Sequence, residues 1–173
     1  IAGTNKLACW SSVTNSSKAW VLPNAIHPDA QVSAIRISPD GRLLAVPTAP
    51  TNVRLVEMNS GTVVQTLPYP GDGKTLAEFA FSPSSEHLAV YAGEDLAVYE
   101  TTTGEQKARR PARVMAGRFS GAEDILALDL GKENGARLEL WNWRTGRVQA
   151  GPFPLPWSTK GMALGPGGKS LAV

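Results

Sequence analysis

The stretch SPDGRLLAV at residues 38–46 returns three times along the chain in altered form. The related stretches are SPSSEHLAV at 82–90, SGAEDILAL at 120–128 and GPGGKSLAV at 165–173, so successive copies begin 44, 38 and 45 residues apart. A period near forty residues is typical of proteins built from repeated small β-sheets. The sequence therefore predicts four similar structural units within its 173 residues.

Each of the first three copies is followed by a second recurring phrase. These sequels are VRLVEMNSG at 53–61, LAVYETTTG at 96–104 and LELWNWRTG at 138–146. The fourth copy ends at Val173 without a sequel, but LACWSSVTN at 7–15 fits the same template, with Asn15 in place of the glycine. If Val173 were joined to Ile1, Leu7 would follow it by seven residues, the same step that separates Val46 from Val53. We therefore expect one unit to be split between the two ends of the chain.

Each unit carries the pattern of four short strands. An alternating strand such as 32–37 leads into the turn Ser38-Pro39-Asp40-Gly41, and the apolar strand 42–46 that follows is expected to be buried on both faces. A third strand with period two ends at the glycine of the second phrase. A polar fourth strand forms the outer edge of each sheet and is expected at 62–67, 105–108 and 147–150. No helical periodicity occurs, and prolines fill the longer connections.

The predicted fold class is all-β, with four repeats of four-stranded antiparallel sheets. The predicted boundaries are 32–67, 75–108 and 113–150 for the complete sheets, 1–31 for the outer strands of the split sheet and 159–173 for its inner strands.

Composition excludes several classes of protein. Charged residues make up 18% of the chain and the net charge is +2, so neither a disordered acidic segment nor a polyanion-binding tail is indicated. The single cysteine, Cys9, allows no disulfide within the chain and no cysteine-rich metal site. No apolar run reaches 18 residues, so no membrane partner is expected. The chain has no initiator Met, as expected of a processed product or a piece of a longer chain, and the cytoplasm is the preferred compartment.

The repeats resemble the WD-repeat family of β-propellers, in the degenerate form common in bacterial proteins. The resemblance rests on the SPDG-type turn with its LAV strand, and on LELWNWRTG, where Trp141-Asn142 occupies the position of the family's Trp-Asp dipeptide. No Gly-His dipeptide precedes a first strand, so we expect the family's His, Ser and Asp hydrogen-bond network to be missing and the blades to depend on apolar packing.

The resemblance leaves three arrangements of the split blade open. Two chains joined head to tail would each complete the other's broken blade and form an eight-bladed ring, which is the arrangement we prefer because it leaves no open sheet edge. A single chain closing into a four-bladed ring is the second. The third is a fragment whose remaining blades lie on another polypeptide or were removed.

The sequence shows no catalytic, cofactor or metal motif, and no cofactor is expected. His27 is expected in a loop and His87 in a solvated turn. The densest basic cluster is expected in the link between two blades, and an aromatic pair is expected in the loop 151–159. These candidate interaction residues are Lys107, Arg109, Arg110 and Arg113, with Phe153 and Trp157.

The leading hypothesis for function is a non-catalytic scaffold that presents its rim loops to a protein or peptide; we expect no nucleic-acid partner. One alternative is a hydrolytic or ligand-binding propeller with a site at the central channel. The axial residues form a poor catalytic set, which consists of Ser33, Arg36, Glu78 and Arg118. The other alternative is an engineered or excised fragment whose only activity is self-association.

Overall fold

The computed structural model contains β-strands as its only regular elements among the residues that it describes. The described residues are 6–11, 16–21, 35–48, 52–68, 77–121, 124–131, 136–155, 162–164 and 170–172.

Three complete four-stranded antiparallel sheets follow one another along the chain, each with its strands in sequence order. The first sheet consists of β3 (Arg36–Ile37), β4 (Leu43–Thr48), β5 (Asn52–Glu57) and β6 (Val63–Pro68). The second consists of β7 (Glu78–Phe81), β8 (His87–Ala92), β9 (Asp95–Glu100) and β10 (Gln106–Pro111). The third consists of β11 (Val114–Phe119), β12 (Ile125–Leu130), β13 (Ala136–Asn142) and β14 (Arg147–Leu155). The predicted all-β class is confirmed.

Two further sheets contain two strands each. One pairs β1 (Lys6–Ser11) with β2 (Ser16–Val21), and the other pairs β15 (Ala163–Leu164) with β16 (Leu171–Ala172). Among the described residues, β1 pairs only with β2 and β16 only with β15, so the two half-sheets do not join within this chain.

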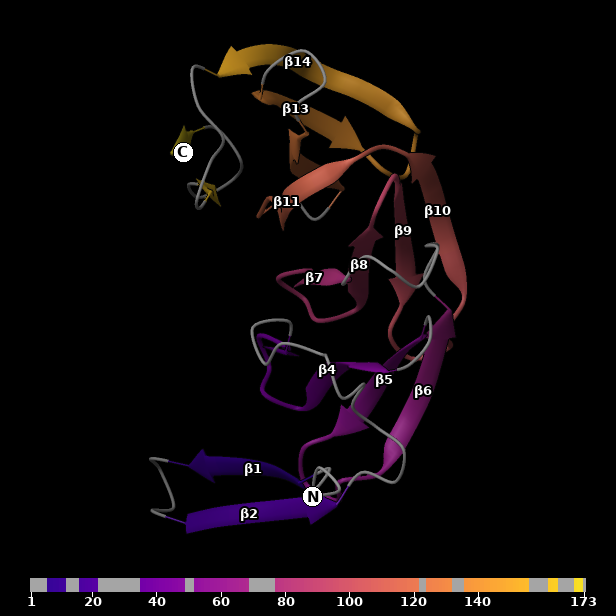
Figure 1. The fold of residues 1–173 in the computed structure, drawn as a ribbon, viewed down its shortest axis with the longest axis vertical. Coiled ribbons are helices and arrows are strands. Elements are labelled where there is room, and N and C mark those ends of the chain that lie inside the picture. Colours follow the sequence, from indigo (N-terminus) through magenta and orange to yellow (C-terminus); the bar gives the residue numbers. More distant parts are fainter. Residues whose placement is uncertain are drawn as a thin grey trace.

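The five sheets lie side by side in an arc (Figure 1). The first strands β7 and β11 line the concave side of the arc, and the fourth strands β6, β10 and β14 follow its convex side. The first strands of neighbouring sheets contact one another directly: β3 contacts β7, and β7 contacts β11.

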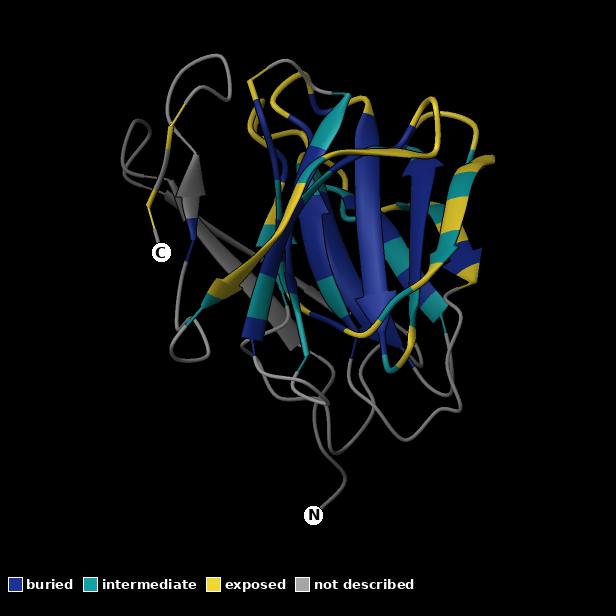
Figure 2. Cartoon of the chain, turned by 90° about the horizontal axis from the view of Figure 1, so that it is seen from above, coloured by how far each residue is buried: buried dark blue, intermediate teal, exposed yellow. Residues whose placement is uncertain are grey.

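The second strand of each complete sheet is the most deeply buried, as Figure 2 shows. Its central alanine, which is Ala45, Ala89 or Ala127, has no exposed surface. Side chains of a strand alternate between the faces of its sheet, so burial along the whole strand requires cover on both faces. The predicted sandwiching of the apolar strands is confirmed in the three complete sheets, whereas Ala172 in the fourth copy is exposed.

Apolar clusters join each sheet to the next. The cluster between the first and second sheets contains, among others, Val53, Leu55 and Leu67 together with Phe79, Leu88 and Val90. The cluster between the second and third sheets contains Tyr91, Leu96 and Val98 together with Leu126, Leu128 and Trp141. Leu88 and Val90 thus face one neighbour while Ala89 and Tyr91 face the other, and each sheet depends on both.

The turn Ser38-Pro39-Asp40-Gly41 forms as predicted. Gly41 has a φ of 72° and its N–H donates to Ser38 O over 2.8 Å, and Ser38 Oγ accepts from Leu43 N over 2.8 Å. Asp40 accepts from Ser38 Oγ and from Arg42 N, and these hydrogen bonds lower the pKa of its carboxyl group. The turn is therefore fixed by its own side chains and by the positive φ that glycine permits.

The fourth strands run further than the sequence predicts. β10 continues to Pro111, and β14 continues to Leu155 through Pro152 and Pro154. Residues 153–155 pair with residues 136–138 of β13 after a register shift. A fourth strand needs hydrogen-bond donors on one side only, so proline is tolerated there although it would break a central strand.

His87 is also placed differently from the prediction. It is not a solvated turn residue: it begins β8, is only 5% exposed, and its ring lies 4.8 Å from that of Trp143. The apolar face of the imidazole thus serves as packing surface between two blades. His27 lies outside the described residues.

A buried hydrogen bond also links the second and third sheets. The backbone N–H of Gly117 on β11 donates to Tyr91 Oη over 3.1 Å, and a Cβ at position 117 would lie 3.2 Å from the Tyr91 ring. Burial raises the pKa of Tyr91, since the phenolate would lose its hydration.

Replacement of Tyr91 by phenylalanine is expected to lower the free energy of unfolding by about 1–3 kcal/mol, because the buried Gly117 N–H loses its acceptor. A hydroxyl with a raised pKa stabilises the fold below its ordinary value near 10, and this contribution is lost as the pH rises through the folded-state value. Urea unfolding at pH 8 and pH 11 would measure both effects. An alkaline loss in Tyr91→Phe as large as in the unmodified chain would contradict the assignment.

Candidate interaction site

The predicted basic cluster lies mainly on a strand, not in the link between blades. Lys107, Arg109 and Arg110 belong to β10, and only Arg113 lies in the link to β11. The predicted strand ends at residue 108, before these arginines, because Pro111 is typical of a connection between blades. The four basic residues therefore do not form one patch, and their surroundings differ.

Lys107 and Arg109 are compensated by carboxylates of their own sheet. Lys107 Nζ lies 2.6 Å from Glu105 Oε2 and 3.4 Å from Glu100 Oε2, and the hydrogen bond to Glu105 raises the pKa of the lysine. Arg109 makes two hydrogen bonds of 3.2 Å to the carboxylate of Asp95, which raises the pKa of the guanidinium. Exposed pairs of this kind contribute little to stability and leave little net charge for a partner.

Arg110 connects two blades. Its Nη1 donates to Glu139 on β13, and its guanidinium carbon lies 5.6 Å from the centroid of the Trp141 ring. The side chain of Glu139 is 6% exposed. Arg110 therefore neutralises a buried carboxylate of the neighbouring blade and is held in place by doing so.

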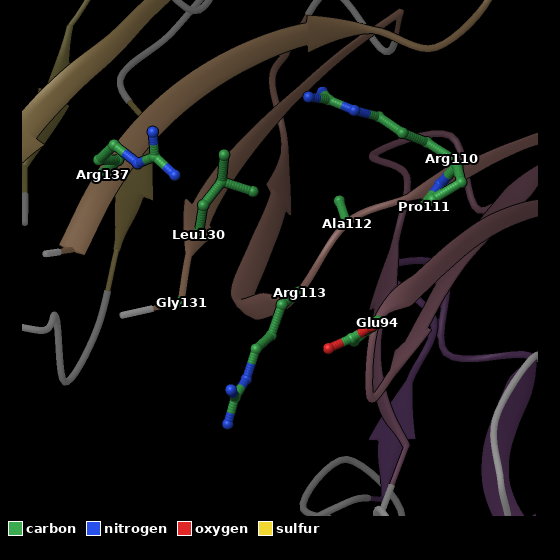
Figure 3. A pocket seen from close by; sticks show the side chains of 8 residues that line it. All are labelled: Glu94, Arg110, Pro111, Ala112, Arg113, Leu130, Gly131 and Arg137. Atoms are coloured by element: carbon green, nitrogen blue, oxygen red, sulfur yellow. The ribbon is translucent and has the colours of Figure 1, made fainter. Parts of the chain in front are cut away.

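Arg113 lines a pocket of about 360 Å³ at the junction of the second and third sheets (Figure 3). The wall includes Glu94 from the bend between β8 and β9, Leu130 and Gly131 at the end of β12, and Arg137 at the start of β13. Topology brings these segments together, because the loops between second and third strands share a rim with the links between blades.

Sequence analysis missed Glu94 and Arg137 as parts of this site. The two residues stand in loops or strand starts 43 positions apart and belong to no charge run. The signal was present in the repeat itself, since both follow a second strand and therefore lie on the same rim as Arg113.

A second pocket, of about 460 Å³, lies on the opposite rim between the first and second sheets. Its charged lining is mostly acidic, with Asp40, Glu57 and Glu86 beside Arg42. Asp40 is engaged in its own turn, and Glu57 accepts a hydrogen bond of 2.6 Å from Ser60. These carboxylates therefore serve the local turns.

The predicted aromatic pair is only partly described. Phe153 lies on β14, not in a loop, and is 48% exposed on the convex edge of the third sheet. Trp157 lies outside the described residues. Its role as a contact stays a prediction.

The axial side offers little chemistry in the part of the chain that is described. Arg36 Nη2 on β3 donates to Glu78 Oε2 on β7 over 2.9 Å, and Arg118 on β11 donates to the backbone oxygen of Gly117. No group of three or more His, Cys, Asp or Glu side chains that could hold a metal occurs among the described residues. Within the same residues, no helix is long and apolar enough to cross a membrane.

Comparison with known proteins bears on the fold. The model of the anaphase-promoting complex subunit 4 WD40 domain matches residues 2–80, from the first half-sheet into β7. The chain has the fold of a β-propeller. The resemblance to WD-repeat propellers inferred from the SPDG turns and LAV strands is confirmed over the matched residues.

Solved structures share the arrangement of the propeller at low sequence identity. Hydrazine synthase of Kuenenia stuttgartiensis superposes with a TM-score of 0.67 at 15% identity, over 87% of this chain and 41% of that one. The Cps50 (Swd1) β-propeller domain of Myceliophteria thermophila superposes with a TM-score of 0.60 at 12% identity, over 82% of this chain and 51% of that one. The propeller thus spans about two fifths to half of these neighbours, and the likeness shows the fold alone.

No curated protein matches the sequence of the propeller. One structural neighbour is an enzyme and the other a propeller domain, so shared fold does not choose between catalysis and binding.

The bond between Arg110 and Glu139 gives a test of how the blades of the propeller are coupled. Arg110→Ala should lower the free energy of unfolding by about 3–5 kcal/mol, because it leaves the Glu139 carboxylate buried and unpaired. The double variant R110M/E139M should recover most of that loss, since an apolar pair needs no desolvation of charge. Arg109→Ala, on the same strand but in an exposed pair, is the matched control and should lower the free energy of unfolding far less. Equal losses for the two arginines in denaturant unfolding would contradict the coupling.

Proposed function

We propose that this propeller is a non-catalytic scaffold for protein–protein interaction, and that two copies joined head to tail complete each other in an eight-bladed ring. The observation that carries the proposal is the exposure of Ala172 on β16. Its counterparts in the complete sheets, Ala45, Ala89 and Ala127, are fully buried. Ala172 therefore occupies a position that the repeat buries elsewhere, and a neighbouring strand and blade would cover it.

The registers of the half-sheets support this reading. Ala163 pairs with Ala172 in β15–β16 as Ala80 pairs with Ala89 in β7–β8, so the C-terminal pair corresponds to the first and second strands of a blade. The N-terminal pair β1–β2 carries the sequel LACWSSVTN and corresponds to the third and fourth strands. The two halves are complementary.

An open strand edge presents unpaired backbone groups and promotes association with another chain. In the proposed ring, β16 of one copy pairs with β1 of the other, at both junctions. Each copy then contributes three complete blades and half of each shared blade. A head-to-tail contact that closes under twofold symmetry ends in a ring, whereas one that does not close would form a filament.

A role in binding is supported by what the blades offer on their surfaces. The described axial residues include an ion pair, Arg36 with Glu78, whereas Glu94, Arg113 and Arg137 lie together around a pocket on one rim. Rim loops held by a rigid sheet are suited to partner recognition.

The strand register of the shared blade can be tested with the native cysteine. Ala89 pairs with Val98 in the second sheet, and their repeat counterparts are Ala172 and Cys9. Directly paired residues on antiparallel strands have Cα atoms close enough for a disulfide. Ala172→Cys is therefore expected to form a covalent dimer with Cys9 of a second copy under mild oxidation, at about twice 18.3 kDa on a non-reducing gel and by mass spectrometry.

Ser170→Cys is the matched control, because Ser170 is also exposed but its repeat counterpart pairs with the position of Ser11, not of Cys9. It should cross-link at least about tenfold more slowly than Ala172→Cys. Removal of Cys9 by Cys9→Ser should abolish the dimer in both. A disulfide within one chain would indicate a closed four-bladed ring, and a monomeric mass for the unmodified chain would refute the two-chain ring.

A further inference from the structure

We infer that the rim pocket between the second and third blades binds a carboxylate side chain of an acidic peptide segment in a protein partner. The inference rests on the proposed scaffold function and names the class of partner. It does not depend on ring closure, because every described residue that lines the pocket belongs to the second or third sheet, to a loop within it or to the link between the two.

The pocket is fixed by backbone hydrogen bonds on both sides of the link. Ala112 N donates to Glu94 O over 2.8 Å, and Gly131 N donates to Arg113 O over 2.8 Å. The link is therefore held to the bend of one blade and to the strand end of the next. A ligand would meet a preformed surface and would not have to order a loop.

The guanidinium of Arg137 offers a buried hydrogen-bond donor on the pocket wall. Its Nε is buried and has no hydrogen-bond partner among the described residues. A buried N–H without an acceptor is unfavourable, and the residue pairs with Leu130 on the pocket wall. Figure 3 shows the Arg137 side chain directed toward Leu130. A carboxylate can accept from Nε and a terminal nitrogen of one guanidinium together.

Arg113 adds a second positive charge to the lining of the pocket. Its aliphatic stem lies against Gly131, where a Cβ would approach Arg113 Cδ to 3.0 Å. Because Gly131 has no side chain, the Arg113 side chain can pack directly against its backbone. No ion pair involving Arg113 or Arg137 is present in the part of the chain that is described, whereas Arg110 is committed to Glu139.

The charge balance favours a single carboxylate. Arg113 and Arg137 together with Glu94 leave one net positive charge, which matches a monoanion. A doubly charged phosphate would meet Glu94 with less compensation. Nucleic acid requires a run of unpaired cations along its backbone, but Lys107 and Arg109 on the adjacent strand are already paired.

The apolar part of the wall consists of Pro111, Ala112 and Leu130. A glutamate has methylene groups that such a surface would cover while its carboxylate reaches the arginines. A volume of about 360 Å³ suits a side chain and its immediate neighbours. These features favour an acidic residue next to an apolar one in an extended peptide.

The test is the binding of two labelled peptides to the chain, measured by fluorescence anisotropy. One peptide alternates Glu with Leu, and the other has Gln in place of every Glu. The Glu peptide should bind at least about tenfold more tightly, a difference of about 1.4 kcal/mol. Arg137→Ala should remove that preference, and Arg137→Lys should restore only part of it because lysine lacks the forked donors.

Three further variants separate an effect on the pocket from a general loss of folding. Glu94→Gln should tighten binding of the Glu peptide by severalfold, a gain that misfolding cannot produce. Gly131→Ala should weaken it by displacing Arg113 without any change of charge. Arg144→Ala, which removes an exposed arginine paired with Asp124 on the third sheet, should leave binding unchanged.

Equal affinity for the Glu and Gln peptides would overturn the inference. So would tighter binding of a phosphoserine peptide or of duplex DNA than of the Glu peptide. The mass of the chain in solution is measured on the same samples. A monomer that binds the Glu peptide would refute the two-chain ring and leave the pocket inference standing. A dimer that does not bind the Glu peptide would refute the pocket inference and leave the ring standing.

Discussion

The second strand of each complete blade is buried on both faces, and the rest of the structure depends on that constraint. A sheet whose central alanine has no exposed surface cannot be stable alone, because each of its two faces needs a packed neighbour. The apolar clusters provide this cover in sequence, from the first sheet to the second and from the second to the third. Stability in such an arrangement is close to a sum of nearest-neighbour interfaces, so the second sheet, which packs against both the first and the third, contributes to two of them.

The same constraint explains how much of the fold could be predicted from the sequence. Burial on two faces requires an apolar run, and the tight turn before it requires a residue that tolerates positive φ. The LAV strands and the turn at Gly41 could therefore be predicted from residue types alone. Strand ends are different, because they depend on what lies beside them. A proline would end a central strand, but it is tolerated in an edge strand, where Pro111 and Pro152 lie. Only the assembled sheet shows whether a given strand is central or at the edge. His87 was misplaced for a similar reason, since Trp143 from the next blade converts a turn position into a packed one.

The candidate site was less predictable than the fold because charge density in a sequence does not reveal pairing. Four basic residues between positions 107 and 113 suggested one positive patch. Two of them are paired within their own sheet, and Arg110 is paired with Glu139, 29 residues away. The charge that remains comes from Arg113 together with Arg137, which lies on another blade. Repeat proteins bring equivalent positions of successive units onto one rim, so their sites are better sought by repeat position than by neighbours in sequence.

In the proposed two-chain ring, the location of the split would determine how specific the assembly is. Blade faces meet through apolar contacts, which have no strong directionality and tolerate small displacements. A division within a blade instead makes the joint a pair of β-strands, where backbone hydrogen bonds fix the register and a slip of one residue turns every side chain to the wrong face. In β16 such a slip would exchange Ala172 with Leu171 at the position where the complete blades hold a small residue against the next sheet. A strand joint is therefore better suited than a face-to-face joint to select one partner in one alignment, and the small central alanine is the residue on which that selection depends.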